Sequence, residues 1–415
     1  MILSQIALKN YLTKTSSSKK VLVAYSGGLD SHVLLHLISQ IPEFTVRAVH
    51  IHHGLQAIAD SWVPHCQNIC DKLNTPFETK YLHLKPKKGE SLEALARQGR
   101  YQALKATLKD DEILVTAQHQ NDQSETLLLQ LFRGAGVQGL ASMPAVSAFG
   151  RRQQQHIRPF LNISRHELEA YAKTHQLEYI DDPSNQDTSF DRNFLRKKIL
   201  PQLRERWLGL DKALNRSAAI QAETLSILDE IAAEDFINIC SEEENTLQIE
   251  SLILLSYPRQ KLLLRYWIAK NGFKYPSEKK LQHIFSNILE ARKDAQPLLE
   301  WQGVQIRRYK NKLYIMSPLS EHDSTQVFYW DTTAKPLYIP SLDLYLKADI
   351  LHERNQTVTV LFRQGGELIH SSNPNKKASL KSILSEAGIP PWERSRLPLI
   401  YHEDKLIQVI GLKKE

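Results

Sequence analysis

A short loop near the start of the chain has residue types suited to holding phosphate. Ser26-Gly27-Gly28-Leu29-Asp30-Ser31 follows an apolar run and leads into a second, helix-compatible one. Two glycines let the backbone turn sharply, and the amides of such a turn, with the N-terminus of the next helix, form an anion cradle. Ser26 and Ser31 add hydroxyl donors, whereas Asp30 would repel phosphate and is expected to hold Mg²⁺ or to order the loop. We therefore predict phosphate binding over the alternative, a plain capped strand-to-helix turn.

The elements around this loop alternate between strands and helices. We expect strands at 21–25, 45–51, 76–82, 112–116 and 156–160, and helices at 31–41, 60–73, 91–108, 122–133 and 164–175. The last helix opens with the capping box Ser164-x-x-Glu167. Near-continuous apolar strands that alternate with helices are typical of a parallel sheet covered on both faces, so the predicted fold class is α/β.

Three polar segments fall at the ends of expected strands: the loop at 26–31, His52-His53-Gly54, and the segment 116–122. Sheets of this kind bind their ligands at the carboxyl ends of the strands. We therefore expect the three segments to converge on one edge of the sheet and to form the functional site there.

The rest of the chain changes in character twice. From about 190 to 300 the pattern is helical, from 301 to 350 it indicates short strands, and a small α+β unit is expected from 355. We predict three domains: a catalytic domain at 1–215, a middle domain at 216–354 that is helical and then β, and a C-terminal domain at 355–415.

Composition and charge indicate a soluble protein with a polyanionic partner. Of the net charge of +7, the segment 190–216 carries +5, with eight Lys or Arg against three Asp or Glu. Three cysteines give neither a disulfide framework nor a paired zinc motif. The N-terminus lacks a signal-peptide core, and no apolar run approaches the ~20 residues of a membrane span. We expect a cytoplasmic protein without a membrane partner.

The loop at 26–31 resembles the SGGxDS loop of the N-type ATP pyrophosphatases, or PP-loop enzymes. These enzymes cleave ATP between its α and β phosphates, which accounts for the missing Gly-Lys-Ser/Thr ending used in γ-phosphoryl chemistry. Further segments resemble the tRNA(Ile)-lysidine synthase family: 52–66, 96–104, 116–143, 158–161, 181–201 and 362–400. The similarity spans nearly the whole chain. It implies a Rossmann-like sheet of the adenine nucleotide alpha hydrolase type, a helical middle domain and a small C-terminal domain.

The resemblance also implies a reaction. ATP, with Mg²⁺, would adenylate the base of the wobble cytidine of the isoleucine tRNA with a CAU anticodon, and L-lysine would then displace AMP at carbon 2, changing codon specificity from AUG to AUA. Activation is needed because a carbonyl oxygen is a poor leaving group and AMP a good one. The attacking ε-amine, whose reference pKa is ~10.4, must lose its proton. A homodimer is a further possibility.

The same resemblance assigns candidate site residues. ATP and pyrophosphate binding is expected of Ser26, Gly27, Gly28, Leu29, Asp30, Ser31, His52 and His53, with Asp30 as the Mg²⁺ ligand. The expected catalytic residues are Asp30, His119 and Asp122. Asp122 would bind metal or orient the lysine or the cytosine, although it also fits a helix N-cap. Contacts to tRNA are expected of Arg97, Arg100, Arg192, Asn193, Arg196, Lys197, Arg363, Lys376, Lys377, Lys381 and Arg394.

The sequence departs from the usual HHxDDQxET pattern of that family at two positions. Gln118 stands where the first His often lies, and Asn121 where an Asp is usual, which leaves Asp122 as the retained acid of the pair. Two alternatives stay open. One is a tRNA thiolase with the same loop, which the absence of a CxxC pair disfavours. The other is a nucleotide-sensing RNA-binding protein without catalysis.

Overall fold

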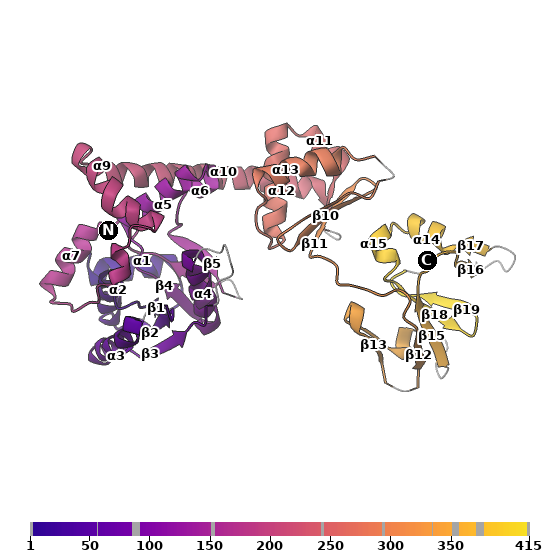
Figure 1. The fold of residues 1–415 in the computed structure, drawn as a ribbon, viewed down its shortest axis with the longest axis horizontal. Coiled ribbons are helices and arrows are strands. Elements are labelled where there is room, and N and C mark those ends of the chain that lie inside the picture. Colours follow the sequence, from indigo (N-terminus) through magenta and orange to yellow (C-terminus); the bar gives the residue numbers. More distant parts are fainter. Residues whose placement is uncertain are drawn as a thin grey trace. The chain divides into compact units, whose positions relative to one another are not determined.

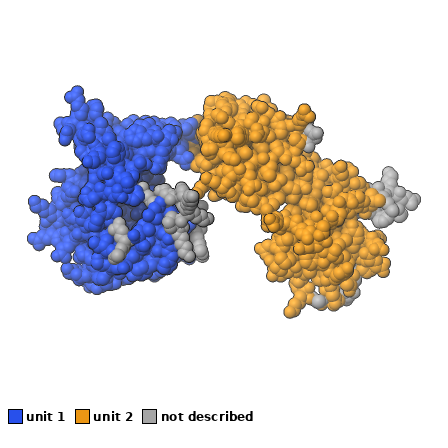
Figure 2. All heavy atoms as spheres, in the orientation of Figure 1, with its two compact units in different colours: residues 1–228 blue, residues 229–415 orange. Residues whose placement is uncertain are grey.

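The computed structural model describes residues 3–55, 57–84, 92–150, 154–241, 245–292, 295–333, 335–350, 357–370 and 377–412. The chain forms two compact units, residues 1–228 and residues 229–415 (Figure 2). The phosphate loop and the other polar segments of the expected site all belong to the first unit.

A six-stranded sheet lies at the centre of the first unit (Figure 1), with the strand order β3-β2-β1-β4-β6-β5. Neighbouring strands are parallel except for β5 and β6, which are antiparallel. The strands are β1 (Lys20–Ala24), β2 (Thr45–His52), β3 (Phe77–Tyr81), β4 (Glu112–Val115), β5 (Val146–Phe149) and β6 (Gln154–Ile157). Because the chain adds β2 and β3 on one side of β1 and β4 on the other, a topological switch point lies between β1 and β4.

Helices cover both faces of this sheet. Successive side chains of β1 point to opposite faces, and because those of residues 21–24 are all apolar, both faces must be covered. Val21 and Val23 pack into a core with α1, α2, α3 and α7, whereas Leu22 packs on the opposite face with α4. The predicted α/β class is confirmed. The helices are α1 (Gln5–Thr15), α2 (Leu29–Ser39), α3 (Trp62–Lys72), α4 (Leu92–Thr107), α5 (Gln120–Phe132), α6 (Val137–Leu140) and α7 (Arg165–Thr174).

Two local predictions needed correction at the far edge of the sheet. The strand expected at 156–160 is the shorter β6, and β5 before it was not predicted. The chain leaves the ladder at Arg158, whose backbone N–H donates to the carbonyl of Ala145. A four-residue strand such as β5 is too short to show an alternating pattern of its own.

After the sheet the chain becomes helical, with α8 (Asp191–Phe194), a π-helical turn η3 (Leu195–Ile199), α9 (Leu200–Arg206) and α10 (Leu210–Ile239). Pro201 lies in the first turn of α9, where its missing N–H costs least. The domain boundary expected at residue 215 falls inside α10, which continues unbroken past it.

The second unit contains two larger sheets, of order β7-β8-β11-β10-β9 and β12-β15-β18-β19. Helices α11, α12 and α13 share a core with the first sheet. Because β12 pairs with β15, the last sheet includes a strand from before residue 355. Among the described residues, no helix has both the length and the apolar character needed to cross a bilayer.

The strands of this unit are β7 (Cys240–Ser241), β8 (Thr246–Gln248), β9 (Leu298–Trp301), β10 (Val304–Tyr309), β11 (Lys312–Met316), β12 (Phe328–Asp331), β13 (Leu337–Ile339), β14 (Leu344–Leu346), β15 (Thr357–Phe362), β16 (Leu368–His370), β17 (Lys377–Ser379), β18 (Pro398–His402) and β19 (Lys405–Val409). Its helices are α11 (Ile249–Leu254), α12 (Tyr257–Lys270), α13 (Glu278–His283), α14 (Leu380–Glu386) and α15 (Pro391–Arg394).

Candidate active site

The phosphate loop joins β1 to α2 and is ordered by its own hydroxyl groups. Ser31 Oγ accepts from the backbone N–H of Ser26 at 3.2 Å and lies 3.0 Å from Ser26 Oγ, which in turn accepts from the N–H of Gly28 at 3.3 Å. Gly28, the N-cap of α2, offers no side-chain acceptor to the helix. The positive end of α2 is therefore available to an anion.

Gly27 is fixed by its surroundings. Its φ is +84°, and a Cβ at this position would lie 2.6 Å from Ile180 Cδ1 and 2.9 Å from Cys66 Sγ. The carbonyl of Gly27 also accepts from the N–H of Ile180 at 3.0 Å. Only glycine fits here, because both the backbone conformation and the close packing exclude a side chain.

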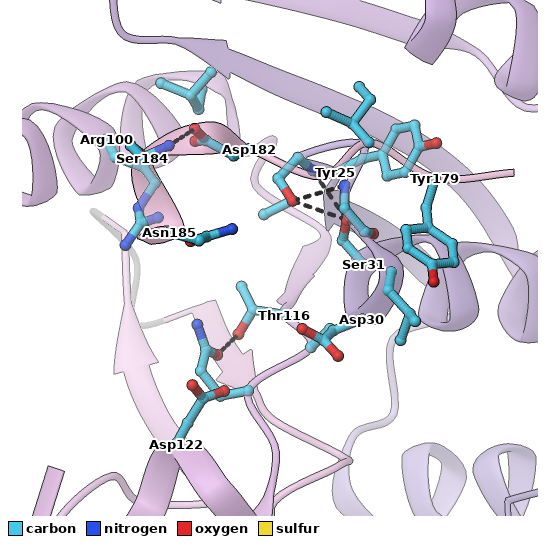
Figure 3. A pocket seen from close by; sticks show the side chains of 18 of the residues that line it. Tyr25, Asp30, Ser31, Arg100, Thr116, Asp122, Tyr179, Asp182, Ser184 and Asn185 are labelled. Carbon is cyan, nitrogen blue, oxygen red and sulfur yellow. Dashed lines mark hydrogen bonds between the residues drawn. The ribbon is translucent and has the colours of Figure 1, made fainter. Parts of the chain in front are cut away.

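The loop opens into a cavity of about 770 Å³ at the carboxyl ends of β1, β2 and β4. All three polar segments predicted to converge contribute to its lining. Figure 3 shows Asp30 and Ser31 on one side of the cavity and Arg100 with Asn185 across from them. A volume of this size accommodates a nucleotide together with a second small substrate.

Asp30 is held by an arginine from the start of α7. Arg165 Nη1 donates to both carboxylate oxygens of Asp30 at 2.7 Å. The backbone N–H of Arg165 donates to Asn121 Oδ1 at 3.0 Å. Burial raises the pKa of Asp30, and the nearby His119 and Arg165 oppose that rise. Asn121 thus links α5 to the residue that holds Asp30, and an amide oxygen serves this purpose as well as a carboxylate would.

His119 caps α5 and faces two carboxylates. Its Nδ1 accepts from the N–H of Asn121 at 3.2 Å, so the neutral ring carries its proton on Nε2. Nε2 lies 3.5 Å from Asp122 Oδ2 and 3.8 Å from Asp30 Oδ2. Asp122 also accepts from the backbone N–H of His119 at 3.1 Å, completing a capping box. The N-cap of α5 is therefore His119 and not Asp122 as the sequence suggested; Asp122 is the third residue of the helix and lines the cavity.

Arg196 neutralises the acidic side of the cavity. It donates to both oxygens of Glu125, at 2.6 and 2.9 Å, and to Asp122 Oδ1 at 3.3 Å. Glu125 is 1% exposed, and the bidentate contact with Arg196 stabilises its buried carboxylate. No site role was predicted for Glu125, which lies about one turn after Asp122 in α5.

The histidines after β2 line the cavity, as predicted, together with Arg100. Burial is the main cause that lowers the pKa of His53, to about 4, so this ring is neutral at neutral pH. His52 Nε2 lies 3.2 Å from Asp60 Oδ1. Arg100 brings a guanidinium to this wall, and its Cζ lies 5.7 Å from the centre of the Tyr101 ring.

The other residues of the first unit that were predicted to contact tRNA differ in their surroundings. Some are hydrogen-bonded within the protein, and others are exposed or line the cavity. Arg192 donates to Thr126 Oγ1 at 3.0 Å, and Asn193 donates to the carbonyls of Ser184 and Asp187 at 2.9 and 2.8 Å. Arg97 is exposed, outside the cavity lining, and Lys197 is part of that lining. Through its two hydrogen bonds Asn193 holds the loop at 184–187, part of which lines the cavity.

The predicted contacts of the second unit also differ among themselves. Arg394 is buried and donates to the carbonyl of Ile389 and to Tyr309 Oη, at 2.8 and 2.7 Å, so it supports the fold. Arg363 lies 3.5 Å from Glu367, and Lys381 is exposed. Lys376 and the side chain of Lys377 lie outside the described residues.

The structure adds site residues that the sequence did not reveal. Arg165, Tyr179, Asn185 and Arg204 line the cavity from α7, the segment after it, and α9. Arg165 follows the predicted capping box of Ser164 and Glu167, which the structure confirms. This capping box was the sequence signal that could have located Arg165, because it sets Arg165 as the first residue of α7.

The loop, the switch point and the cavity together define a PP-loop nucleotide-binding domain, and the family model of the PP-loop domain matches residues 3–203. The models of the TilS substrate binding domain and the TilS substrate C-terminal domain match residues 247–314 and 358–415. The tRNA(Ile)-lysidine synthase of Pectobacterium atrosepticum is 40% identical over 97% of this chain and 92% of its own length. That of Coxiella burnetii is 39% identical over 97% and 91%. The chain belongs to the tRNA(Ile)-lysidine synthase family.

Among solved structures, the U34-tRNA thiolase NcsA from Methanococcus maripaludis is similar with a TM-score of 0.46 and 16% identity, over 53% of this chain and 77% of that one.

Replacing Arg196 by Ala should destabilise the first unit by at most about 3 kcal/mol, the low end for breaking a buried ion pair, because the buried Glu125 then keeps only the 3.8 Å contact with Arg192. Denaturant unfolding followed by circular dichroism measures the loss. Adding Glu125→Gln to the same chain should recover most of it, and Arg206→Ala, at an exposed position, should cost little. A recovery that fails to appear would contradict the assigned pairing.

Replacing Asn121 by Ala should weaken ATP binding about fivefold, the equivalent of one hydrogen bond, because the backbone N–H of Arg165 loses its acceptor Asn121 Oδ1 and the partner of Asp30 is then less well fixed. Isothermal titration calorimetry with ATP and Mg²⁺ measures this. Asn121→Asp keeps an acceptor oxygen and should bind within about twofold of the parent. Equal loss in both variants would show that the amide nitrogen matters instead.

Proposed function

We propose that this chain is an ATP-dependent ligase that attaches L-lysine to carbon 2 of the wobble cytidine in the isoleucine tRNA with a CAU anticodon. One observation carries the proposal beyond family membership: the pyrophosphatase loop and the acidic side chains of α5 line the same cavity. A nucleotide and an amine substrate would therefore meet in one place. The product would read AUA in place of AUG.

The loop would hold the phosphates of ATP. The amides after Gly27, the hydroxyls of Ser26 and Ser31, and the positive end of α2 fit an anion, and Arg100 faces the cavity from the opposite wall. Mg²⁺ fits as well, since it is commonly held by one or two carboxylates and substrate phosphates, and the Asp30 carboxylate reaches the cavity. The ion would neutralise charge on the departing pyrophosphate.

The first step would be attack of the cytidine oxygen 2 on the α-phosphorus, with pyrophosphate leaving. In the second, the lysine ε-amine would attack carbon 2 and AMP would leave. Asp122, which lines the cavity, would orient the lysine ammonium before it loses its proton to solvent. His119, with its proton on Nε2, would hold Asp30 and Asp122 in position instead of accepting a proton at that atom.

The partners proposed with this reaction are the tRNA, ATP and L-lysine, and a homodimer in the cytoplasm is part of the same proposal. A tRNA thiolase is less well supported. Burial is the main cause that raises the pKa of Cys66 and Cys70 to about 12, which keeps both thiols protonated and poorly reactive.

Purified protein should incorporate [¹⁴C]lysine into unmodified isoleucine tRNA with a CAU anticodon when ATP is present. Filter-bound radioactivity measures the incorporation, and omission of ATP should abolish it. When lysine is omitted and ATP is present, tRNA labelled with tritiated cytidine should accumulate the AMP-linked intermediate. Absence of label from the tRNA would exclude the ligase, and label that does not depend on ATP would exclude adenylation.

Asp30→Ala should reduce tRNA-dependent AMP formation by at least about 100-fold, because a charged group at the reacting phosphates is lost. Thin-layer chromatography of labelled ATP measures the rate, and a gel shift with the same tRNA should change little. Asp60→Ala, a carboxylate exposed beside His52, is the matched control and should retain most activity. Unchanged turnover in Asp30→Ala would remove Asp30 from the site.

A further inference from the structure

Six of the eight cations of the basic segment 190–216 fall into two groups once the segment is folded. Arg192, Arg196 and Arg204 each lie within 4 Å of an acidic side chain: Asp122 or Glu125 for the first two, and Asp211 for Arg204. Lys198, Arg206 and Arg216 are exposed and make no ion pair within the part of the chain that the structure describes. The charge available to a polyanion is therefore on the outer positions of η3, α9 and α10.

An exposed aromatic side chain lies between these cations in the sequence. Trp207 ends α9 and is 56% exposed, and Leu208 after it is 98% exposed. Of the six tryptophans, Trp267, Trp301, Trp330 and Trp392 are buried and Trp62 is half-buried. A single exposed apolar residue is ordinary, but two adjacent ones in a basic segment, Trp207 and Leu208, form a small apolar patch that a partner with flat apolar groups could cover.

Trp207 follows directly on residues of the cavity. Lys197 of η3 and Arg204 of α9 line the cavity, and the backbone N–H of Trp207 donates to the carbonyl of Leu203 at 2.9 Å. The ion pair of Arg204 with Asp211 fixes the turn between α9 and α10 (Figure 1). The exposed tryptophan is thus held one helical turn beyond the edge of the site.

We propose that Trp207 stacks on a nucleobase next to the reacting cytidine, while Lys198, Arg206 and Arg216 contact the flanking phosphates. This inference rests on the proposed function and names the surface that receives the substrate. A cytidine can enter the cavity only from a single-stranded loop whose neighbouring bases stay outside, and such bases stack on aromatic side chains. The exposed cations of the same segment favour RNA over a second copy of this chain, because a copy would bring the same positive charge.

The test uses the full chain and an anticodon stem-loop RNA carrying 2-aminopurine at a loop position beside the wobble cytidine, without ATP or lysine. Binding should quench both the 2-aminopurine and the exposed tryptophan emission. Trp207→Ala should remove this quenching and weaken binding about tenfold, whereas Trp207→Phe should retain most of the affinity. Since no catalysis is involved, a chain that fails to form lysidine still reports on this surface.

Charge-reversal variants test whether the exposed cations contact the phosphates. Lys198→Glu with Arg216→Glu should weaken binding and lower the slope of log affinity against log salt by about 2, because each of the two cations neutralises one phosphate in the parent complex. Lys14→Glu and Ile6→Ala, exposed positions of α1, are controls and should leave binding unchanged. Thermal unfolding should match the parent in every variant, because these side chains are exposed.

Two results would overturn the proposal. One is full RNA affinity in Trp207→Ala, with no change of tryptophan emission when the parent chain binds RNA. The other is a change of molar mass by light scattering in Trp207→Ala while RNA affinity is kept, which would make this face an interface between copies.

Discussion

The contact between Asp30 and Arg165 is the interaction on which the geometry of the site depends. It joins the phosphate loop to the start of α7, and through Asn121 it joins both to the start of α5. Three segments that are far apart in sequence thereby take fixed positions around one cavity. The capping boxes of α5 and α7 contribute by setting the residue at which each helix begins.

Charge in this site is balanced locally. The carboxylates of Asp122 and Glu125 face Arg196, and Asp30 faces Arg165, so each of these three carboxylates has a partner of opposite sign. Such balance reduces the desolvation penalty that an isolated buried charge would carry. It also means that a run of basic residues in the sequence overstates the charge that the folded surface presents to RNA.

The sequence predicted the parts of the fold that depend on local pattern. Apolar strands next to phosphate-binding residues located β1 and the loop, and the convergence at the strand ends followed from parallel topology, which the cavity lining confirms. It could not show that Arg196 turns inward to Glu125 or that Arg394 is buried. Whether an arginine is buried depends on its tertiary contacts, and the residue type alone does not reveal them. The role of Arg165 and the exposure of Trp207 depend on contacts between distant segments, which one-dimensional spacing does not contain.

The segment between α7 and α8 is fastened at both of its ends. Ile180 binds the carbonyl of Gly27, and Asn193 binds the carbonyls of Ser184 and Asp187. A stretch held in this way tolerates exchange of its outward side chains but not a change in its length, because one added residue would break the contact at one end. Related sequences and engineered variants should therefore differ in this segment by substitutions, whereas insertions and deletions should fall in other loops.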